Sequence, residues 1–271
     1  MNAADVRTPS ATPLISVSRV TKHFDGGKER YVALDGIDLH VADGEFVCLL
    51  GASGCGKSTL LNMLAGFETP SEGTVEMRGQ RIVSSGPERM LFFQDSGAAL
   101  FPWLTAAENV RFGLKLAKTP RAIQDETISR YLSMVGLGAH ADKFPSQLSG
   151  GMRQRLQIAR ALAINPDVLL MDEPFGALDP LTRRRMHDEL LRIWRDTRKT
   201  IVFVTHDISE ALTLADRIVL LTVGPRSHVA ATFQIDLARP RLMTDPAVAS
   251  ILAEIEAAMG SHRGTDDEDL S

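Results

Sequence analysis

The sequence predicts an α/β fold whose main sheet is mostly parallel. Four continuous apolar runs have the length and composition of buried strands; they span residues 45–50, 168–171, 201–205 and 217–222. Helix-like segments alternate with these runs, an order that is typical of a parallel sheet with right-handed crossovers. A glycine-rich loop and a helix directly follow the first run, so we expect that loop at the end of a sheet strand.

The loop has the sequence Gly51-Ala52-Ser53-Gly54-Cys55-Gly56-Lys57-Ser58-Thr59. Its glycines lack Cβ atoms, so the backbone can fold around a phosphate with its N–H groups inward, and the N-terminus of the following helix adds partial positive charge. We expect Lys57 to reach the β- and γ-phosphates of a nucleotide and Ser58 to place its hydroxyl on Mg²⁺. A plain Gly/Ser turn is the alternative, and the flanking strand and helix argue against it. The loop therefore predicts a Walker A nucleotide site.

Composition narrows the classes of partner. With 271 residues, 44% of them hydrophobic and 24% charged, the chain can bury the core of one large or two small domains. Its net charge of −4 offers no general basic face, which disfavours nucleic acid as a partner. Its apolar segments are shorter than the roughly 20 residues needed to span a bilayer, so we expect a cytosolic protein that reaches a membrane only through partners.

The two cysteines, Cys48 and Cys55, indicate a reducing compartment. They lie seven residues apart on a strand and in a loop, a poor arrangement for a disulfide. Cys48 is expected to be a buried strand residue. Because a phosphate-binding loop is electropositive and accessible, we expect Cys55 to react with thiol reagents.

The segment before the glycine-rich loop predicts a leader and a small β layer. Residues 1–13 are rich in Ala, Thr and Pro without periodicity, as in a disordered leader. Four short β-like runs are expected to form an antiparallel layer beside the main sheet, and they span residues 14–20, 31–41, 74–77 and 81–83. Phe24 stands before the turn between the first two runs. It could stack on an adenine ring, although a lone Phe is usually a core residue.

Residues from about 95 to 160 predict a helical insert. Before it, an apolar run from Met90 ends in Gln94, at a position where a strand can deliver a side chain into a nucleotide crevice; a plain loop residue is the alternative. The apolar segment 98–104 is either a buried loop or a docking surface. Thr105 and Glu108 form a capping box for one helix, and a second runs from about 120 to 136.

The insert ends with a second candidate anion site. Ser149, Gly150 and Gly151 precede a helix predicted over 153–163, so backbone N–H groups at its start could bind an anion; a plain N-cap is the equally weighted alternative. Leu156, Ala159, Leu162 and Ala163 form the apolar face of this helix. Its arginines are therefore expected on a solvated or interfacial side, and they are Arg153, Arg155 and Arg160.

Two carboxylates follow the apolar run 168–171. Adjacent residues at a strand end point in roughly opposite directions, so Asp172 and Glu173 should have different roles. We expect Asp172 to hold the hydration shell of Mg²⁺ and Glu173 to orient or deprotonate an attacking water. Acidic strand ends are often only surface residues, and the phosphate loop makes that alternative the weaker one.

The run 201–205 delivers His206 to the same sheet edge. A His there is either structural or a sensor of the γ-phosphate, and both interpretations remain open. Asp207 and Glu210 are predicted to cap the helix that follows, and Asp179 leads into a helix predicted over 181–198. A short β/α appendage is expected over 224–260. The predicted nucleotide-binding domain spans 14–260, and 261–271 forms an acidic tail.

In this order, the motifs resemble those of the ATP-binding subunit of an ABC transporter over about residues 14–225. They are Gly51–Ser58, Gln94, Leu148–Met152, Leu169–Glu173, Ala177–Asp179 and His206. The resemblance implies a P-loop NTPase core. It also implies that Phe24 stacks on adenine, that Gln94 senses Mg²⁺ and communicates with the membrane subunit, and that His206 reports the γ-phosphate. Residues 148–152 would contact the ATP held by the other subunit, and Asp179 would cross that interface.

The same resemblance implies partners. Two ATP molecules would be sandwiched in a head-to-tail pair, either a homodimer or a paired ATPase subunit. An integral-membrane permease and, for an importer, a soluble substrate-binding protein are implied, with the chain peripheral at the cytoplasmic face of the inner membrane. Nucleic acid is not an expected partner.

A finer similarity points to the bacterial nitrate/sulfonate/taurine importer group. The segments that carry it are 101–105, 148–155, 171–183 and 236–241. They predict an ATPase that powers import of a small anionic or zwitterionic solute. An importer ATPase for another solute is one alternative. A non-transport ABC ATPase acting on DNA or the ribosome would need coiled-coil insertions, tandem cassettes or a basic face, and a P-loop kinase would have no use for 148–152.

Overall fold

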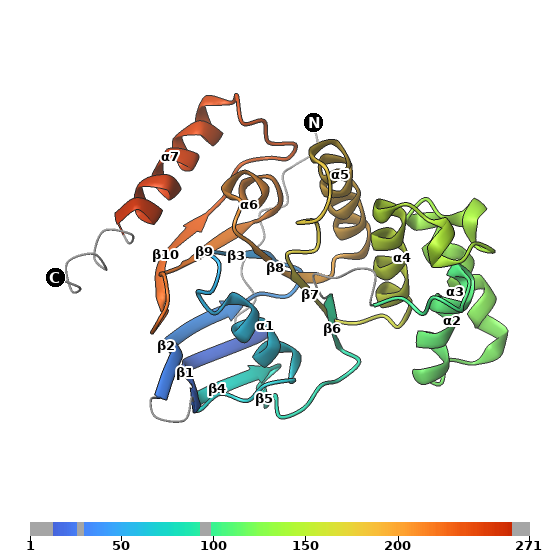
Figure 1. The fold of residues 1–271 in the computed structure, drawn as a ribbon, viewed down its shortest axis with the longest axis horizontal. Coiled ribbons are helices and arrows are strands. Elements are labelled where there is room, and N and C mark those ends of the chain that lie inside the picture. Colours follow the sequence, from blue (N-terminus) through green and yellow to red (C-terminus); the bar gives the residue numbers. More distant parts are fainter. Residues whose placement is uncertain (1–12, 26–29, 93–98, 262–271) are drawn as a thin grey trace.

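The computed structural model describes residues 13–25, 30–92 and 99–261, and its core contains two sheets (Figure 1). Gln94, nearly all of the predicted leader and residues 262–271 of the predicted tail lie outside the described residues. Among the helices that are described, none has the length and apolarity to cross a bilayer.

The main sheet has six strands in the order β10-β9-β3-β8-β7-β6. The five strands from β9 to β6 are parallel, which confirms the predicted sheet type, while β10 pairs antiparallel with β9 at one edge. The strand bounds are β3 Phe46–Leu50, β6 Arg89–Phe92, β7 Val168–Asp172, β8 Thr200–Thr205, β9 Arg217–Leu221 and β10 Val229–Gln234.

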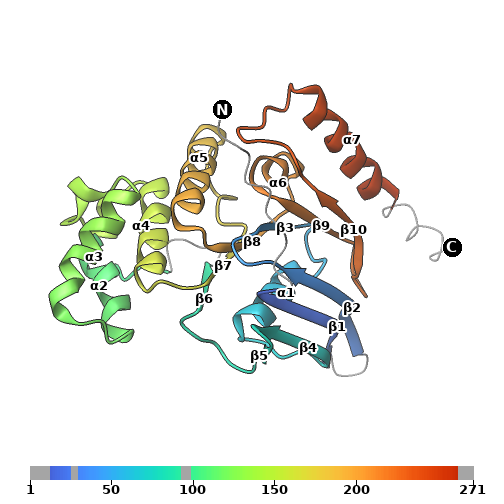
Figure 2. The same ribbon diagram turned by 180° about the vertical axis from the view of Figure 1, so that it is seen from behind.

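The second sheet is antiparallel, in the order β2-β1-β4-β5, as the short β-like runs predicted. Its strands are β1 Ile15–Asp25, β2 Arg30–Val41, β4 Glu72–Met77 and β5 Gln80–Arg81. Figures 1 and 2 show helix α1 (Lys57–Ala65) between the two sheets.

The side chains of β3 alternate between two hydrophobic clusters, because successive strand residues point to opposite faces. Val47 and Leu49 belong to the cluster that contains α1 and the antiparallel sheet. Phe46, Cys48 and Leu50 belong to the other cluster, which is covered by helices. Both faces of β3 are therefore buried, which explains its unbroken apolar sequence.

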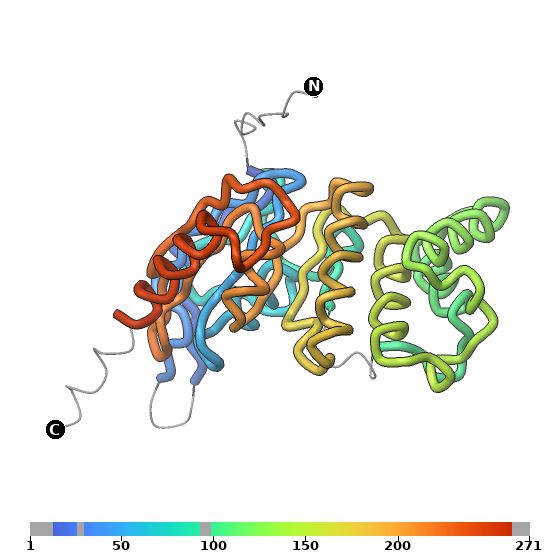
Figure 3. The backbone as a smooth tube through the Cα atoms, turned by 90° about the horizontal axis from the view of Figure 1, so that it is seen from above, coloured from blue at the N-terminus to red at the C-terminus, as the bar shows by residue number. Residues whose placement is uncertain are grey.

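The predicted helical insert forms a group at one end of the molecule, seen beyond α5 in Figure 3. Its helices are α2 Ala106–Leu116, α3 Arg121–Met134 and α4 Gly150–Ala163, with 3₁₀ turns at Gly138–His140 and Pro145–Gln147. The capping box is confirmed: Glu108 N–H donates to Thr105 Oγ1 over 3.3 Å, and Thr105 N–H donates to Glu108 Oε2 over 2.8 Å.

Helix α4 differs from the prediction in its first residue. It begins at Gly150 rather than at 153, because the Ser149 hydroxyl accepts a hydrogen bond from Met152 N–H and makes Ser149 the N-cap. Its arginines, which were expected on a solvated or interfacial side, are half-buried. Arg153 donates to Leu148 O over 2.8 Å, Arg155 donates to Val135 O over 3.1 Å, and Arg160 lies 5.6 Å from the Phe101 ring centroid.

Three further helices, α5 Pro180–Thr197, α6 Ile208–Leu214 and α7 Pro246–Ser261, contribute to the hydrophobic cluster on the other face of β3. The segment between β10 and α7 is held by a buried guanidinium. Arg241 donates four hydrogen bonds of 2.6–3.0 Å to backbone carbonyls, and the acceptors are Leu212, Ala215, Ile235 and Leu237. Burial, with the charge of Arg239 nearby, lowers the pKa of Arg241 to about 10.

Replacement of Arg241 by Ala is expected to destabilise the protein by roughly 2–4 kcal/mol, because it leaves several buried carbonyls without a donor. Thermal unfolding followed by circular dichroism measures the change. Arg195→Ala, at an exposed position of α5, is the matched control and should change stability by less than about 0.5 kcal/mol. Equal melting temperatures for the two variants would show that Arg241 does not stabilise this segment.

Candidate nucleotide-binding site

The glycine-rich loop connects β3 to α1 and depends on glycine at two positions. Gly54 and Gly56 have φ values of +81° and +87°, in the left-handed region that favours glycine. A Cβ on Gly56 would also lie 2.6 Å from Leu34 Cδ2. Gly56 is the N-cap of α1 and offers no side chain to its first turn, so the N–H groups there can bind a ligand.

Lys57 lies folded against its own loop and is only 5% exposed. Its Nζ donates to the carbonyls of Gly51 and Ala52, each over 2.7 Å, and lies 3.7 Å from Cys55 Sγ. Cys55 is 1% exposed, so the expectation of an accessible thiol is wrong. Its side chain points into the hydrophobic cluster around α1, where a reagent cannot reach it without opening the loop.

A pocket of about 280 Å³ lies over the loop. Most of the residues predicted to bind the nucleotide line it, although they come from both sheets. They are Phe24, Ser53, Gly54, Gly56, Lys57, Ser58, Thr59, Asp172 and Glu173, joined by Tyr31 and Ala33. Gly51, the first residue of the loop, is buried and does not line the pocket.

Asp172, at the end of β7, shares a hydrogen bond with the Ser58 side chain. Burial raises the pKa of Asp172, the Ser58 hydrogen bond opposes the rise, and the neighbouring Glu173 charge adds to it. A hydroxyl and a carboxylate in contact are the hard oxygen donors that suit Mg²⁺. The described residues contain no cluster of three or more His, Cys, Asp or Glu side chains that could hold a metal. A cation here would therefore need phosphate oxygens and water to complete its coordination.

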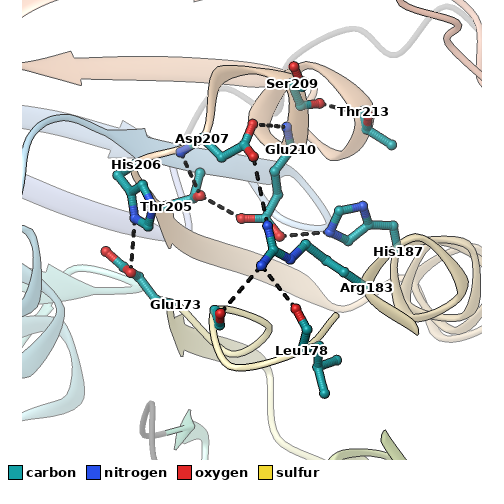
Figure 4. Close-up of polar contacts among 11 residues, drawn as sticks. Glu173, Leu178, Arg183, His187, Thr205, His206, Asp207, Ser209, Glu210 and Thr213 are labelled. Carbon is teal, nitrogen blue, oxygen red and sulfur yellow. Dashed lines mark hydrogen bonds and ion pairs between the residues drawn. The ribbon is translucent and has the colours of Figure 1, made fainter. Parts of the chain in front are cut away.

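Glu173 faces a different partner. Its Oε2 lies 3.0 Å from His206 Nδ1, a contact drawn in Figure 4. Its backbone has φ +42°, which is uncommon for a residue other than glycine, and Glu173 N–H donates to Val204 O over 3.1 Å. Strained backbone of this kind often occurs where a side chain must be aimed. The two adjacent carboxylates thus have separate partners.

An aromatic pair forms the other side of the pocket. Phe24 on β1 and Tyr31 on β2 are partners in the strand register, and they are 41% and 47% exposed. Phe24 was predicted at the site and Tyr31 was not, although a second aromatic residue just after the same turn was a signal for it. The segment after β9 supports this wall, because Arg226 N–H and Ser227 N–H donate to Val32 O and Ala33 O over 2.8 and 3.2 Å.

The second candidate anion site is a separate hollow of about 260 Å³ at the start of α4, lined in part by Ser149 and Gly151. A Cβ on Gly151 would lie 3.1 Å from Thr182 Cγ2, so α4 approaches α5 closely there. Gly150 packs near Leu178. Asp179 caps α5 by accepting a 3.0 Å hydrogen bond from Thr182 N–H, and its hydrogen bonds to Thr182 lower the pKa of Asp179. The two pockets have no lining residue in common.

The expected capping box at α6 is only half formed. Asp207 Oδ1 accepts a hydrogen bond from Glu210 N–H over 3.1 Å, as predicted. The Glu210 carboxylate does not accept from Asp207 N–H, which donates to Thr205 Oγ1 instead. It contacts His187 Nε2 at 2.7 Å and accepts a hydrogen bond from the Thr205 hydroxyl (Figure 4). Sequence reasoning missed this contact because His187 lies on another helix.

Known proteins are similar in sequence to most of this chain. A family profile described as ABC transporter matches residues 34–176. The bicarbonate transport ATP-binding protein CmpD of Synechococcus elongatus is 46% identical over 245 residues, which cover 88% of this chain and 87% of that protein. The nitrate import ATP-binding protein NrtD of the same species is 44% identical over 241 residues, covering 87% of each chain.

Solved structures of ABC proteins are similar to this chain in fold as well. A dimeric post-hydrolysis structure of the ATP-binding cassette MJ0796, bound to ADP and Pi, has a TM-score of 0.69 and 33% identity, and the match covers 83% of this chain and 100% of that one. The structure of cbiO1 from Clostridium perfringens has a TM-score of 0.77 and 26% identity, with 91% and 93% coverage. The chain therefore belongs to the ABC transporter family, among its ATP-binding proteins.

Proposed function

We propose that this chain is the ATP-hydrolysing subunit of an importer for a small anion and that it powers transport through a partner permease. The observation that carries the proposal is that Lys57, Ser58, Asp172 and Glu173 all line one pocket. The relatives named for bicarbonate and nitrate import support the class of solute. That class is one of the two expected from the sequence, which were a small anionic or a zwitterionic solute.

In this proposal, Lys57 exchanges its loop carbonyls for phosphate oxygens. Its ammonium group is a compact charge that can follow the β- and γ-phosphates, and the first turn of α1 adds N–H donors. Phe24 stacks on adenine. Ser58 and Asp172 hold Mg²⁺, which would supply positive charge to the phosphate oxygens when it is bound.

Glu173 is the residue that we assign to water activation. Its carboxylate can accept a proton or a hydrogen bond from the attacking water, and His206 beside it can contact both Glu173 and the γ-phosphate. Gln94 lies outside the described residues, and its proposed role is still to sense Mg²⁺.

The separation of the two pockets supports a head-to-tail pair of subunits. Ser149 and Gly151 line a hollow distinct from the Lys57 pocket of the same chain, and Gly150 lies between them in the sequence. A second copy, or a paired ATPase subunit, would bring its Ser149 to the ATP held here, with Asp179 crossing the interface. The dimeric form of MJ0796 supports this arrangement.

An exposed aromatic cluster suggests where the permease binds. Trp103 is 69% exposed, and its ring centroid lies 5.6 Å from that of Phe101, which in turn lies 4.5 Å from that of Phe112. A groove of about 650 Å³, lined by Phe92 and Arg160 among others, lies nearby between β6 and α4. This surface would bind the permease at the cytoplasmic face of the membrane, and a soluble substrate-binding protein would deliver the solute from the other side.

Glu173→Gln is expected to bind ATP with affinity within about threefold of the wild type and to hydrolyse it at least ~100-fold more slowly. The amide preserves size and ground-state contacts but cannot take a proton. Equilibrium nucleotide binding and phosphate release measure the two quantities, with exposed Glu254→Gln as control. Wild-type turnover in Glu173→Gln would remove Glu173 from this role.

Lys57→Ala should instead weaken ATP binding by about 10- to 100-fold and lower turnover as well, because it removes charge-assisted hydrogen bonds to phosphate. Isothermal titration with ATP and Mg²⁺ measures the affinity. Lys115→Ala, at an exposed position on α2, should bind ATP like the wild type. Unchanged affinity in Lys57→Ala would contradict the phosphate contact.

ATP is expected to convert Glu173→Gln from monomer to dimer, because the trapped nucleotide closes the interface. Adding Ser149→Arg should block dimer formation while ATP still binds to each monomer, since a large side chain would fill the hollow at α4. Analytical ultracentrifugation measures the mass, and Ser146→Arg at a nearby exposed position is the control. A dimer that forms equally well with Arg at 149 would contradict the proposed interface.

A further inference from the structure

A buried polar cluster lies behind His206 and outside the nucleotide pocket (Figure 4). Its members are Thr205 at the end of β8, Glu210 in the first turn of α6 and His187 on α5, all less than one-tenth exposed. The Glu210 carboxylate accepts a hydrogen bond from the Thr205 hydroxyl and lies 2.7 Å from His187 Nε2. Three elements of the fold therefore meet at one carboxylate.

The cluster holds both neighbours of His206. Thr205 Oγ1, besides donating to Glu210, accepts a 3.0 Å hydrogen bond from Asp207 N–H. The Asp207 carboxylate in turn accepts from Glu210 N–H over 3.1 Å. Thr205, before His206, and Asp207, after it, are thus both hydrogen-bonded to Glu210, which fixes the turn between them. His206 itself is exposed and has its 3.0 Å contact with Glu173.

Helix α5 anchors this turn from the other side. Arg183 and His187 are four residues apart and so share a face of α5. Arg183 Nη2 donates to Leu178 O over 3.1 Å and to Gly176 O over 3.3 Å, while its Nη1 lies 4.0 Å from Asp207 Oδ2. The same helix face therefore contacts the segment before Asp179 and the turn at His206.

We infer that Thr205 and Glu210 are positioning residues that aim His206 at Glu173, with His187 fixing the Glu210 carboxylate. The inference rests on the proposed ATPase function of this site. Apolar side chains could fill the same volume without the cost of burying a carboxylate and an imidazole. Hydrogen bonds are directional, whereas apolar packing is not, so the hydrogen bonds fix the backbone of the turn in one orientation. Misplacing a reacting group by about 1 Å can cost ~100-fold in rate.

The first test uses Thr205→Val, which keeps the shape of the side chain and removes the hydroxyl that bonds both Glu210 and Asp207. In the full-length chain, kcat for ATP hydrolysis should fall about 10- to 100-fold while KM for ATP stays within about threefold. Thr205→Ser should restore kcat. Thr213→Val is the matched control, because its hydroxyl donates to Ser209 O, one turn earlier on the same helix.

The second test asks whether Thr205 acts through His206. In a His206→Ala background, Thr205→Val should lower kcat by no more than about twofold, because the group that it positions is already absent. Glu210→Leu should behave like Thr205→Val, and Glu210→Gln, which keeps an acceptor and a donor, should retain most of the activity. A wild-type kcat in Thr205→Val would overturn the inference. So would a double variant whose fold-loss in kcat equals the product of the losses in Thr205→Val and His206→Ala. A wild-type chain without ATPase activity would instead overturn the proposed function.

Discussion

The register of the parallel sheet is the constraint on which the site depends. Leu50, the last residue of β3, pairs with Thr205 of β8, and Asp172 of β7 pairs with Val204 of the same strand. Parallel strands in this register end at one edge, so the glycine-rich loop, the two carboxylates and His206 emerge together. Residues more than 150 positions apart in the sequence meet there because three strands stop at the same level. A shift of one strand by a single residue would point these side chains to the wrong face.

Helix α1 gives this edge the geometry of the proposed phosphate site. Its apolar side chains pack between the two sheets, so its N-terminus is held rigidly at the pocket. Lys57 is a largely buried cation whose ammonium group is satisfied by backbone carbonyls rather than by a carboxylate. Such carbonyls are weaker partners for an ammonium than phosphate oxygens, since hydrogen bonds between two ions are the stronger class. The loop can therefore hold the lysine and, in the proposed site, still release it to a nucleotide.

The antiparallel sheet and the helical group each supply what the main sheet lacks. The antiparallel sheet brings the aromatic wall of Phe24 and Tyr31 to the pocket. The helical group carries Ser149 away from Lys57 and presents the start of α4 on a different surface. The buried cluster at Glu210 connects α5 to the turn at His206, so the end of α5 that begins at Asp179 and the sheet edge that carries Glu173 and His206 are parts of one packed unit.

The sequence by itself determined the fold class, nearly all of the strands and helices, the capping box at Thr105 and the place of the glycine-rich loop between β3 and α1. These features depend on periodicity, caps and glycine positions, which are set by neighbours along the chain. Only the tertiary structure decided that Cys55 is buried, that Tyr31 lies beside Phe24 in one wall of the pocket, that Arg153 is half-buried and that Glu210 bonds Thr205 and His187 rather than closing its capping box. Burial and the choice of a hydrogen-bond partner depend on elements distant in sequence, and no local pattern records which of them will pack together.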